Sequence, residues 1–349
     1  MTGEIAAILA MDGIASGAIY LLIGLGLVLI FAVTRVIFVP FGDIAAFTAL
    51  SLASLETGTR PGTVALVAGL ALLATLIECT ALVRAGEIGR LPRTLFFYLV
   101  LPLIPVAAVW LVAGMALSMP VRIALSLALV LPIAPLLDRI VFRPIADASV
   151  LLLLTVAVAL HFALSGMGLL FFGPEGVRTK PLADAVLDVA GLIVNAQTLL
   201  IVIAAIVFSG LLFLVFEYTL LGKALRATAV NRTGARLVGI RPATTGTIAY
   251  LLASLLAGIS GVLIAPVTTI FYDSGFLIGL KAFVGAIIAG MTSYPGTALG
   301  SLLVGLLESY ASFWSSAYKE VVVFGILIPV LLWRSLSMAA TDEEEEAEE

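Results

Sequence analysis

Long apolar stretches separated by short polar turns follow one another along almost the whole chain. Cutting the sequence at charges and at proline and glycine clusters gives eleven apolar segments: residues 12–34, 38–54, 63–83, 96–118, 121–141, 148–172, 198–220, 244–270, 275–292, 297–315 and 320–334. A helix needs about 20 apolar residues to cross the hydrocarbon core, and it pairs its own backbone N–H and C=O groups. The pattern therefore predicts an all-α polytopic integral membrane protein. Because the second, ninth and last segments are short, we expect eight to eleven true spans.

The composition indicates a lipid environment. Of the 349 residues, 62% are hydrophobic and 11% are charged, whereas roughly a quarter of the residues in a soluble domain are charged. The net charge of −4 comes largely from the final acidic run, so the net charge does not favour nucleic-acid binding. We expect residues 1–339 to form one transmembrane domain and residues 340–349 to form an acidic, disordered tail.

The basic residues favour one orientation of the chain. If the N-terminus lies outside and all eleven segments cross, twelve of the eighteen Lys and Arg residues face the cytoplasm. Loops rich in Lys and Arg resist translocation, so this asymmetry is the expected one. The sequence therefore predicts a multi-pass protein of a bacterial inner membrane with a cytoplasmic C-terminal tail.

Two loops are long enough to carry structure of their own. The outer loop, 173–197, has apolar residues at roughly helical spacing between 183 and 190, which predicts a short interfacial helix. The cytoplasmic loop, 221–243, contains five basic residues and no acidic ones. In it, Asn231 is suited to cap a second short helix, Gly239 to end that helix in the left-handed conformation, and Pro242 to prevent its continuation.

Two interpretations of the cytoplasmic loop remain open. It can be a topogenic anchor that meets anionic lipid headgroups, or a coupling element that docks on a separate motor subunit and transmits its closure to the spans. The residues that would make up the coupling element are Gly222, Lys223, Arg226, Asn231, Arg232, Gly234, Arg236, Leu237 and Gly239.

The loop cannot itself be a phosphate-binding loop. Lys223 is followed by Ala224, and position 217 is Glu where such a loop requires glycine. Any ATP must therefore be bound by a partner subunit. The single cysteine, Cys79, allows neither an intramolecular disulfide nor a cysteine-based metal cluster. We expect no cofactor, metal or catalytic site in this chain.

The candidates for a transport pathway or a gate are Gly42 and three charged residues within the apolar segments, Asp43, Lys281 and Glu308. A charge near the bilayer centre costs about 2.5–3.5 kcal/mol on insertion scales unless it is paired or hydrated. Lys281 and Glu308 lie at similar depth in neighbouring segments, which favours a structural ion pair. A lining role for both, or snorkelling of Lys281 to the outer interface, remains open.

Other interior residues have simpler interpretations. His161, the only histidine, has no acid or cysteine three or four residues away, so we interpret it as a core or helix-interface residue. Glu78 is expected to reach Arg84 or lipid headgroups. Glycines four residues apart allow helix backbones to approach closely in lipid; they are Gly13 with Gly17, Gly275 with Gly279, and Gly296 with Gly300.

Several motifs together resemble the permease subunits of branched-chain amino acid ABC transporters, the Liv-type permeases. They are the stretch from Asp12 to Tyr20, Thr34 to Ile37, Phe172 to Pro174, the loop from Gly222 to Ile240, Leu280 to Phe283, and the glycines between Gly290 and Gly300. The resemblance covers most of the chain. It departs after Ile37, where the family usually has Asn and His before Gly and an acid, and this chain has Phe38 to Phe41 before Gly42 and Asp43. The region 85–120, with its apolar segment 96–118, resembles an insertion relative to the shorter members of the family.

The resemblance implies an importer complex. Two such permease subunits, identical or paralogous, would sit above two ATP-binding cassette subunits, and a periplasmic binding protein would deliver the substrate. Branched-chain amino acids, other small amino acids and amides are all compatible with it. An ATP-independent secondary transporter or channel is the alternative, although the chain shows neither several intramembrane acids nor a clear inverted repeat.

Overall fold

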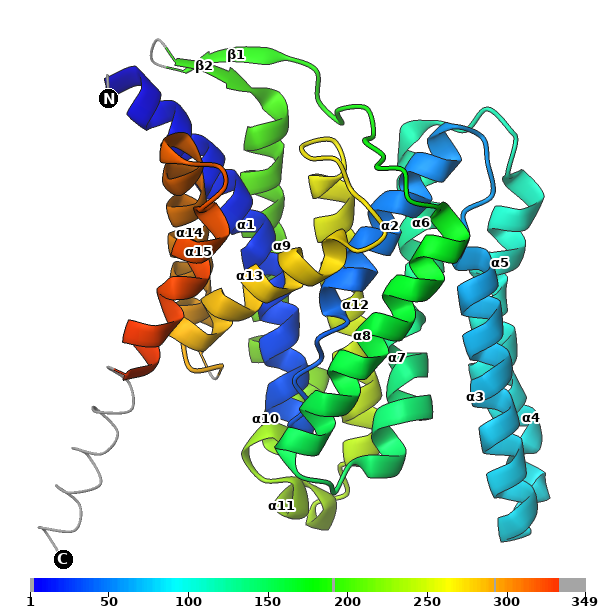
Figure 1. The fold of residues 1–349 in the computed structure, drawn as a ribbon. Helices are drawn as coiled ribbons and strands as arrows, with labels where there is room; N and C mark the ends of the chain where they lie inside the picture. Colours follow the sequence, from blue (N-terminus) through cyan, green and yellow to red (C-terminus); the bar gives the residue numbers. More distant parts are fainter. Residues whose placement is uncertain (1–2, 190–191, 292, 333–349) are drawn as a thin grey trace, which may run out of the picture.

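The computed structural model describes residues 3–189, 192–291 and 293–332, and these residues form a bundle of helices with one short hairpin at its edge (Figure 1). The helices are α1 (Gly3–Thr34), α2 (Phe41–Glu56), α3 (Thr63–Ala85), α4 (Leu91–Leu95), α5 (Leu101–Val112), α6 (Met119–Val130), α7 (Ile133–Leu137), α8 (Val150–Phe172), α9 (Ala196–Tyr218), α10 (Leu220–Val230), α11 (Arg232–Leu237), α12 (Pro242–Ile264), α13 (Ser274–Ile288), α14 (Tyr294–Trp314) and α15 (Lys319–Gly325). The strands are β1 (Val186–Val189) and β2 (Leu192–Asn195).

Seven helices in the described residues are long and apolar enough to cross a membrane. They are α1, α3, α8, α9 and α12, together with two composite helices, Ile88–Val112 and Met119–Ile145. The composite helices continue through short π-helical turns at Phe96–Val100 and Asp138–Phe142. The expected polytopic helical class is confirmed, whereas the count of about eleven spans is not. The remaining apolar segments correspond to the shorter helices α2, α13 and α15 and to α14, which contains Glu308.

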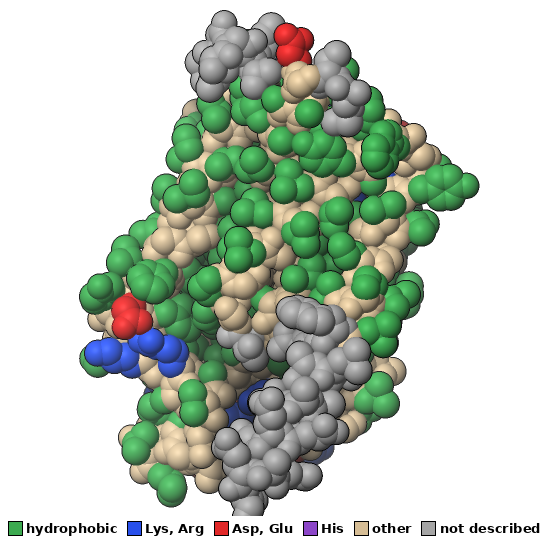
Figure 2. Space-filling view, turned by 90° about the vertical axis from the view of Figure 1, so that its left-hand side faces the viewer, with side chains coloured by type: hydrophobic (Ala, Val, Ile, Leu, Met, Phe, Trp, Pro, Cys, Tyr) green, Lys and Arg blue, Asp and Glu red, His purple; other side chains and the backbone are tan. Residues whose placement is uncertain are grey.

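Two of the long helices are central and one composite helix is peripheral. In the most apolar part of each, 78% of the residues are buried in α1 and 72% in α12, compared with 11% in Ile88–Val112. Apolar residues on the outer helices therefore face their surroundings. Figure 2 shows one side of the molecule on which hydrophobic side chains predominate, with a few charged groups at the top and in the lower half. Such a surface fits a lipid environment.

The helix α2 is short because it starts inside the bundle. The chain leaves α1 at Arg35, which has a left-handed φ of 63°, and continues without helical structure to Pro40. Figure 1 shows this connection rising from the lower end of α1 to the start of α2 in the middle of the molecule. Fourteen of the sixteen residues of α2 are buried, which explains why a segment too short to span is nevertheless apolar on all sides.

The outer loop contains a β-hairpin in place of the predicted interfacial helix. Strands β1 and β2 pair antiparallel, with Val186 opposite Asn195. The prediction of a helix from the spacing of apolar residues was wrong. Several residues of the hairpin are β-branched and favour strands, namely Val186, Val189, Ile193 and Val194. The side chain of Asn195 then caps α9 by accepting a hydrogen bond from Gln197 N at 2.9 Å. The hairpin and the first residues of α1 lie at one end of the molecule, and α10 and α11 lie at the other, here called the α11 end (Figure 1).

Candidate functional site

The predicted pair of short helices in the basic loop is confirmed as α10 and α11. Asn231 Oδ1 accepts a hydrogen bond from Gly234 N at 2.8 Å and begins α11. Gly239 follows α11 with a φ of 85°, a conformation that favours glycine. Thr219 caps α10 in the same way, with its Oγ1 accepting from Gly222 N at 3.0 Å. The loop is therefore a folded element whose local sequence specifies both of its helix starts.

Several contacts hold α10 rigidly to the bundle. Arg226 donates to Glu217 Oε2 at 2.9 Å and to the Phe216 carbonyl at 2.7 Å, both on α9. A Cβ on Gly222 would overlap the backbone of α9 at Val215 and Phe216, so the turn between the two helices requires glycine. On the other side, Thr245 Oγ1 of α12 donates to Thr228 Oγ1 of α10 at 3.1 Å. Of the predicted coupling residues, Arg226 and Gly222 thus serve to anchor the element.

Other residues of the same element face away from the bundle. Lys223 and Arg236 are exposed, Arg232 is half-buried, and Leu237 is 85% exposed. Large apolar side chains are also exposed on or next to these two helices, namely Leu220, Val230 and Val238. Exposed apolar side chains together with basic ones are typical of interaction surfaces. We call Lys223, Val230, Arg236, Leu237 and Val238 the α10–α11 surface.

A second polar network links the start of α12 to its neighbours at the α11 end. Arg143 donates to Asp138 Oδ2 at 3.1 Å, to Thr247 Oγ1 at 2.6 Å and to the Ala243 carbonyl at 3.1 Å. Sequence reasoning did not single out this network, although an acid such as Asp138 within an apolar segment is the signal that would have found it. The first turns of α12, which directly follow α11, are therefore fixed to the composite helix Met119–Ile145.

The expected partner of Glu78 is wrong. Glu78 is paired with Arg139 of the composite helix Met119–Ile145, and not with Arg84. The two residues are 61 positions apart, so their proximity follows from the packing of helices and not from spacing along the chain. This pair ties α3 to the same region as the Arg143 network.

Asp43 and His161 form a buried pair in the middle of the bundle. The Nδ1 atom of His161 on α8 lies 2.8 Å from Asp43 Oδ2 in the first turn of α2, and a carboxylate at this position accepts the Nδ1 proton. Asp43 is 1% exposed and His161 is 4% exposed. The expected core position of His161 is confirmed. Its partner was missed because it comes from a distant helix.

Lys281 and Glu308 form the predicted ion pair. Lys281 Nζ lies 2.5 Å from Glu308 Oε1, and the other carboxylate oxygen accepts a 2.5 Å hydrogen bond from the Tyr20 hydroxyl of α1. Glu320 at the start of α15 adds a second carboxylate 3.2 Å from Lys281. The cluster joins α1, α13, α14 and α15. Lys281 is thus paired with two carboxylates, and the ion pair that the sequence favoured is present.

Glycines bring α2 and α13 into close backbone contact. A Cβ on Gly42 would overlap the Gly275 carbonyl, and a Cβ on Gly279 would lie 3.2 Å from the Gly42 backbone. Gly13 and Gly17 allow α1 to approach α14 in the same way, at Leu306 and Leu302. The prediction that spaced glycines serve helix packing is confirmed for Gly13 with Gly17 and for Gly275 with Gly279.

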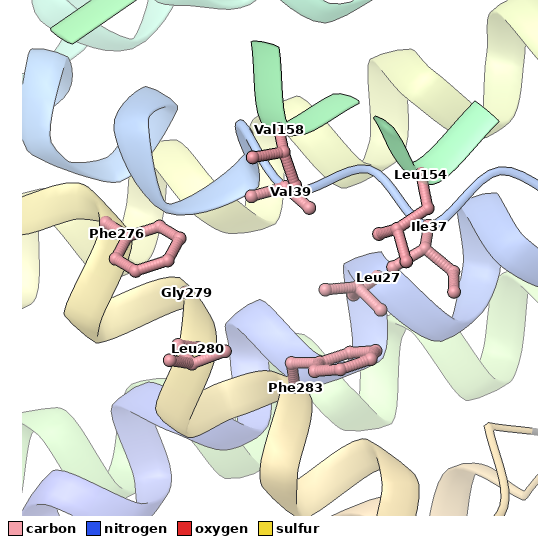
Figure 3. A pocket seen from close by; sticks show the side chains of 9 residues that line it. All are labelled: Leu27, Ile37, Val39, Leu154, Val158, Phe276, Gly279, Leu280 and Phe283. Atoms are coloured by element: carbon pink, nitrogen blue, oxygen red, sulfur yellow. The ribbon is translucent and has the colours of Figure 1, made fainter. Parts of the chain in front are cut away.

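An apolar pocket of about 150 Å³ lies beside the α2–α13 contact (Figure 3). Side chains from four segments point into it: Leu27 of α1, Ile37 and Val39 of the non-helical connection, Leu154 and Val158 of α8, and Phe276, Gly279, Leu280 and Phe283 of α13. The ring of His161 stacks on Phe276 with centroids 4.7 Å apart. The buried polar pair therefore supports one wall of the pocket.

No group of three or more His, Cys, Asp or Glu residues is placed to hold a metal ion within the described part of the chain. The fold and these groups define a polytopic helical membrane protein with a folded, basic element fixed at one end. A family model described as "Branched-chain amino acid transport system / permease component" matches residues 9–331, and the chain belongs to this family.

Named relatives support the same assignment. The chain is 29% identical over 203 residues to the high-affinity branched-chain amino acid transport system permease protein LivH of Escherichia coli K12, a match that covers 56% of this chain and 66% of LivH. It is also 29% identical over 217 residues to the permease protein BraD of Pseudomonas aeruginosa, covering 60% and 70% of the two chains. The match thus spans just under two thirds of the length of LivH. No solved structure gives a significant match.

Proposed function

We propose that this chain is the membrane-spanning permease subunit of an ABC importer for branched-chain amino acids or related small amino acids and amides. The observation that carries the proposal is the α10–α11 surface, which exposes basic and apolar side chains on an element rigidly fixed to α9 and α12. The family match supports transport of this substrate class. A headgroup anchor would also use exposed basic and apolar side chains, so the family match is what favours a coupling element over an anchor.

In the proposed complex, two permease subunits, identical or paralogous, contact two ATP-binding cassette subunits at the α11 end. A periplasmic binding protein delivers substrate at the hairpin end. The partner subunits bind the ATP, and this chain needs no cofactor of its own. The complex lies in the bacterial inner membrane, with the α11 end and the C-terminal tail in the cytoplasm, because basic loops resist translocation.

The geometry suggests how ATP-driven closure reaches the spans. A push on the α10–α11 surface passes directly to α12 through the covalent connection and the Thr228–Thr245 hydrogen bond. The helix α12 is a central element, and glycine at position 261 lets it approach the backbone of α2 at Ala45. A shift of α12 therefore displaces α2, whose first turn holds Asp43. Packed helices switch between discrete arrangements and do not deform continuously, which suits a two-state gate.

Affinity purification in mild detergent tests the proposal. The wild-type chain should co-purify with a nucleotide-binding ATPase, and the variant Arg236→Glu/Leu237→Asp should lose it, because both side chains are exposed on the proposed docking surface. Replacing residues 232–236 with Gly and Ser should have the same effect.

A matched control is Arg90→Glu, which reverses an exposed charge outside the loop and should retain the ATPase. Purification of the chain alone, combined with ATP-independent solute flux in liposomes, would contradict the proposal and favour a secondary transporter or channel.

A further inference from the structure

The pocket in Figure 3 is built from regular stripes on two helices that face each other. On α13, Phe276, Leu280 and Phe283 are spaced four and three residues apart, so they lie on one face. On α8, Leu154 and Val158 share a face with His161, three residues further along. The pocket is therefore the space between these two faces, closed on a third side by Leu27 of α1.

Non-helical backbone forms part of the pocket wall. Ile37 and Val39 belong to the connection between α1 and α2, which runs through the interior of the bundle. At membrane depth, irregular backbone is tolerated only where protein buries it or where it lines a cavity. In secondary transporters, substrate sites are typically formed by such interrupted helices near the middle of the membrane. The helices α2 and α13 both begin at about mid-height of the molecule in Figure 1.

The size and chemistry of the pocket restrict what it can hold. Its volume is about 150 Å³, and the nine lining residues are apolar or glycine. An apolar cavity of about this volume in a protein core binds a benzene-sized molecule. A branched aliphatic group of three or four carbons fits the same volume, whereas a charged or strongly hydrated group would lose its hydration without finding a partner.

We propose that this pocket is a subsite on the translocation route that receives the aliphatic side chain of the transported amino acid. The inference rests on the proposed import function and adds to it a specificity-determining role for Leu280, Phe276 and Val158. Asp43 and His161 do not line the pocket; Asp43 holds the His161 ring, and that ring stacks on Phe276.

The test uses the complete importer with its ATPase and binding-protein partners, reconstituted in liposomes, with ATP-driven uptake of leucine and alanine measured side by side. Leu280→Trp fills the pocket, so the leucine-to-alanine uptake ratio should fall by about tenfold or more. Leu280→Ala enlarges it, so phenylalanine uptake should rise relative to leucine uptake. The binding protein is the same throughout, and changes in these ratios are therefore due to the permease.

Leu277→Trp is the matched control, because Leu277 is on the same helix, is 44% exposed and does not line the pocket. It should leave both uptake ratios unchanged. If Leu280→Trp fails to assemble, Leu280→Ala decides the question alone. ATP-driven uptake with ratios unchanged in the Leu280 variants would overturn the subsite and leave the import function in place. Absence of ATP-driven uptake in the wild type would overturn the import function and the subsite together.

Discussion

At the scale of single residues, the ammonium group of Lys281 lies between two carboxylates, Glu308 at 2.5 Å and Glu320 at 3.2 Å. Lys281→Ala would leave Glu308, which is partly buried, without its cation. Breaking a buried ion pair by removing one partner costs about 3–5 kcal/mol. We expect Lys281→Ala to lower the thermal stability and the assembled yield of the complex in detergent, while the leucine-to-alanine uptake ratio of the remaining material stays the same.

The exposed Lys180 provides a control for this prediction, since Lys180→Ala removes a lysine without breaking a buried pair. Normal yield and stability of Lys281→Ala together with altered substrate selectivity would contradict the structural role. In that case Lys281 would line the substrate route.

Prediction at the level of residues succeeded where the free-energy cost of an unpaired charge in an apolar segment decided the outcome. The charges of Lys281 and Glu308 within apolar segments must be compensated. Their similar depth along neighbouring segments indicated that they pair with each other. The same reasoning did not find the partner of His161, because a neutral histidine carries no comparable cost and its nearest acid in sequence lies far away. The Asp43–His161 pair joins α2 to α8 across 118 positions of the chain.

At the scale of elements, the close contact of α2 and α13 depends on glycine. Gly42→Ala places a methyl group against the Gly275 carbonyl, and overpacking of this kind typically costs about 1–3 kcal/mol. We expect Gly42→Ala to lower the melting temperature and to reduce uptake, because the displaced helices carry Asp43 and the pocket wall. Gly69→Ala on α3 is the control, as a Cβ there meets no other atom within 4 Å. Equal stability of the two variants would show that α2 and α13 separate without cost.

The elements that the sequence predicted correctly are those with local signals. The caps at Asn231 and Gly239 specify α11, and long apolar runs specify the spans. The hairpin was missed because its apolar residues fit helical spacing as well as strand alternation. Pairing between β1 and β2 decided between the two.

At the scale of the whole molecule, we expect the α11 end and the hairpin end to lie on opposite sides of the membrane, because basic loops resist translocation. In a Cys79→Ser background, a cysteine introduced at Asp184 in the exposed outer loop should react with a membrane-impermeant maleimide in intact spheroplasts. A cysteine introduced at the exposed position Arg236 should react only after the membrane is opened. The reverse pattern of labelling would place the basic loop outside and would contradict ATPase docking there.

The sequence by itself determined the helical membrane class, the folded basic loop and the need to compensate Lys281, because apolar length, helix capping and the cost of a buried charge act locally or along one segment. Only the tertiary structure decided that α2 starts inside the bundle, that Asp43 meets His161, that Glu78 pairs with Arg139, and that four segments line an apolar pocket. These features join residues far apart in the chain. They depend on which helix faces pack together, which no local pattern specifies.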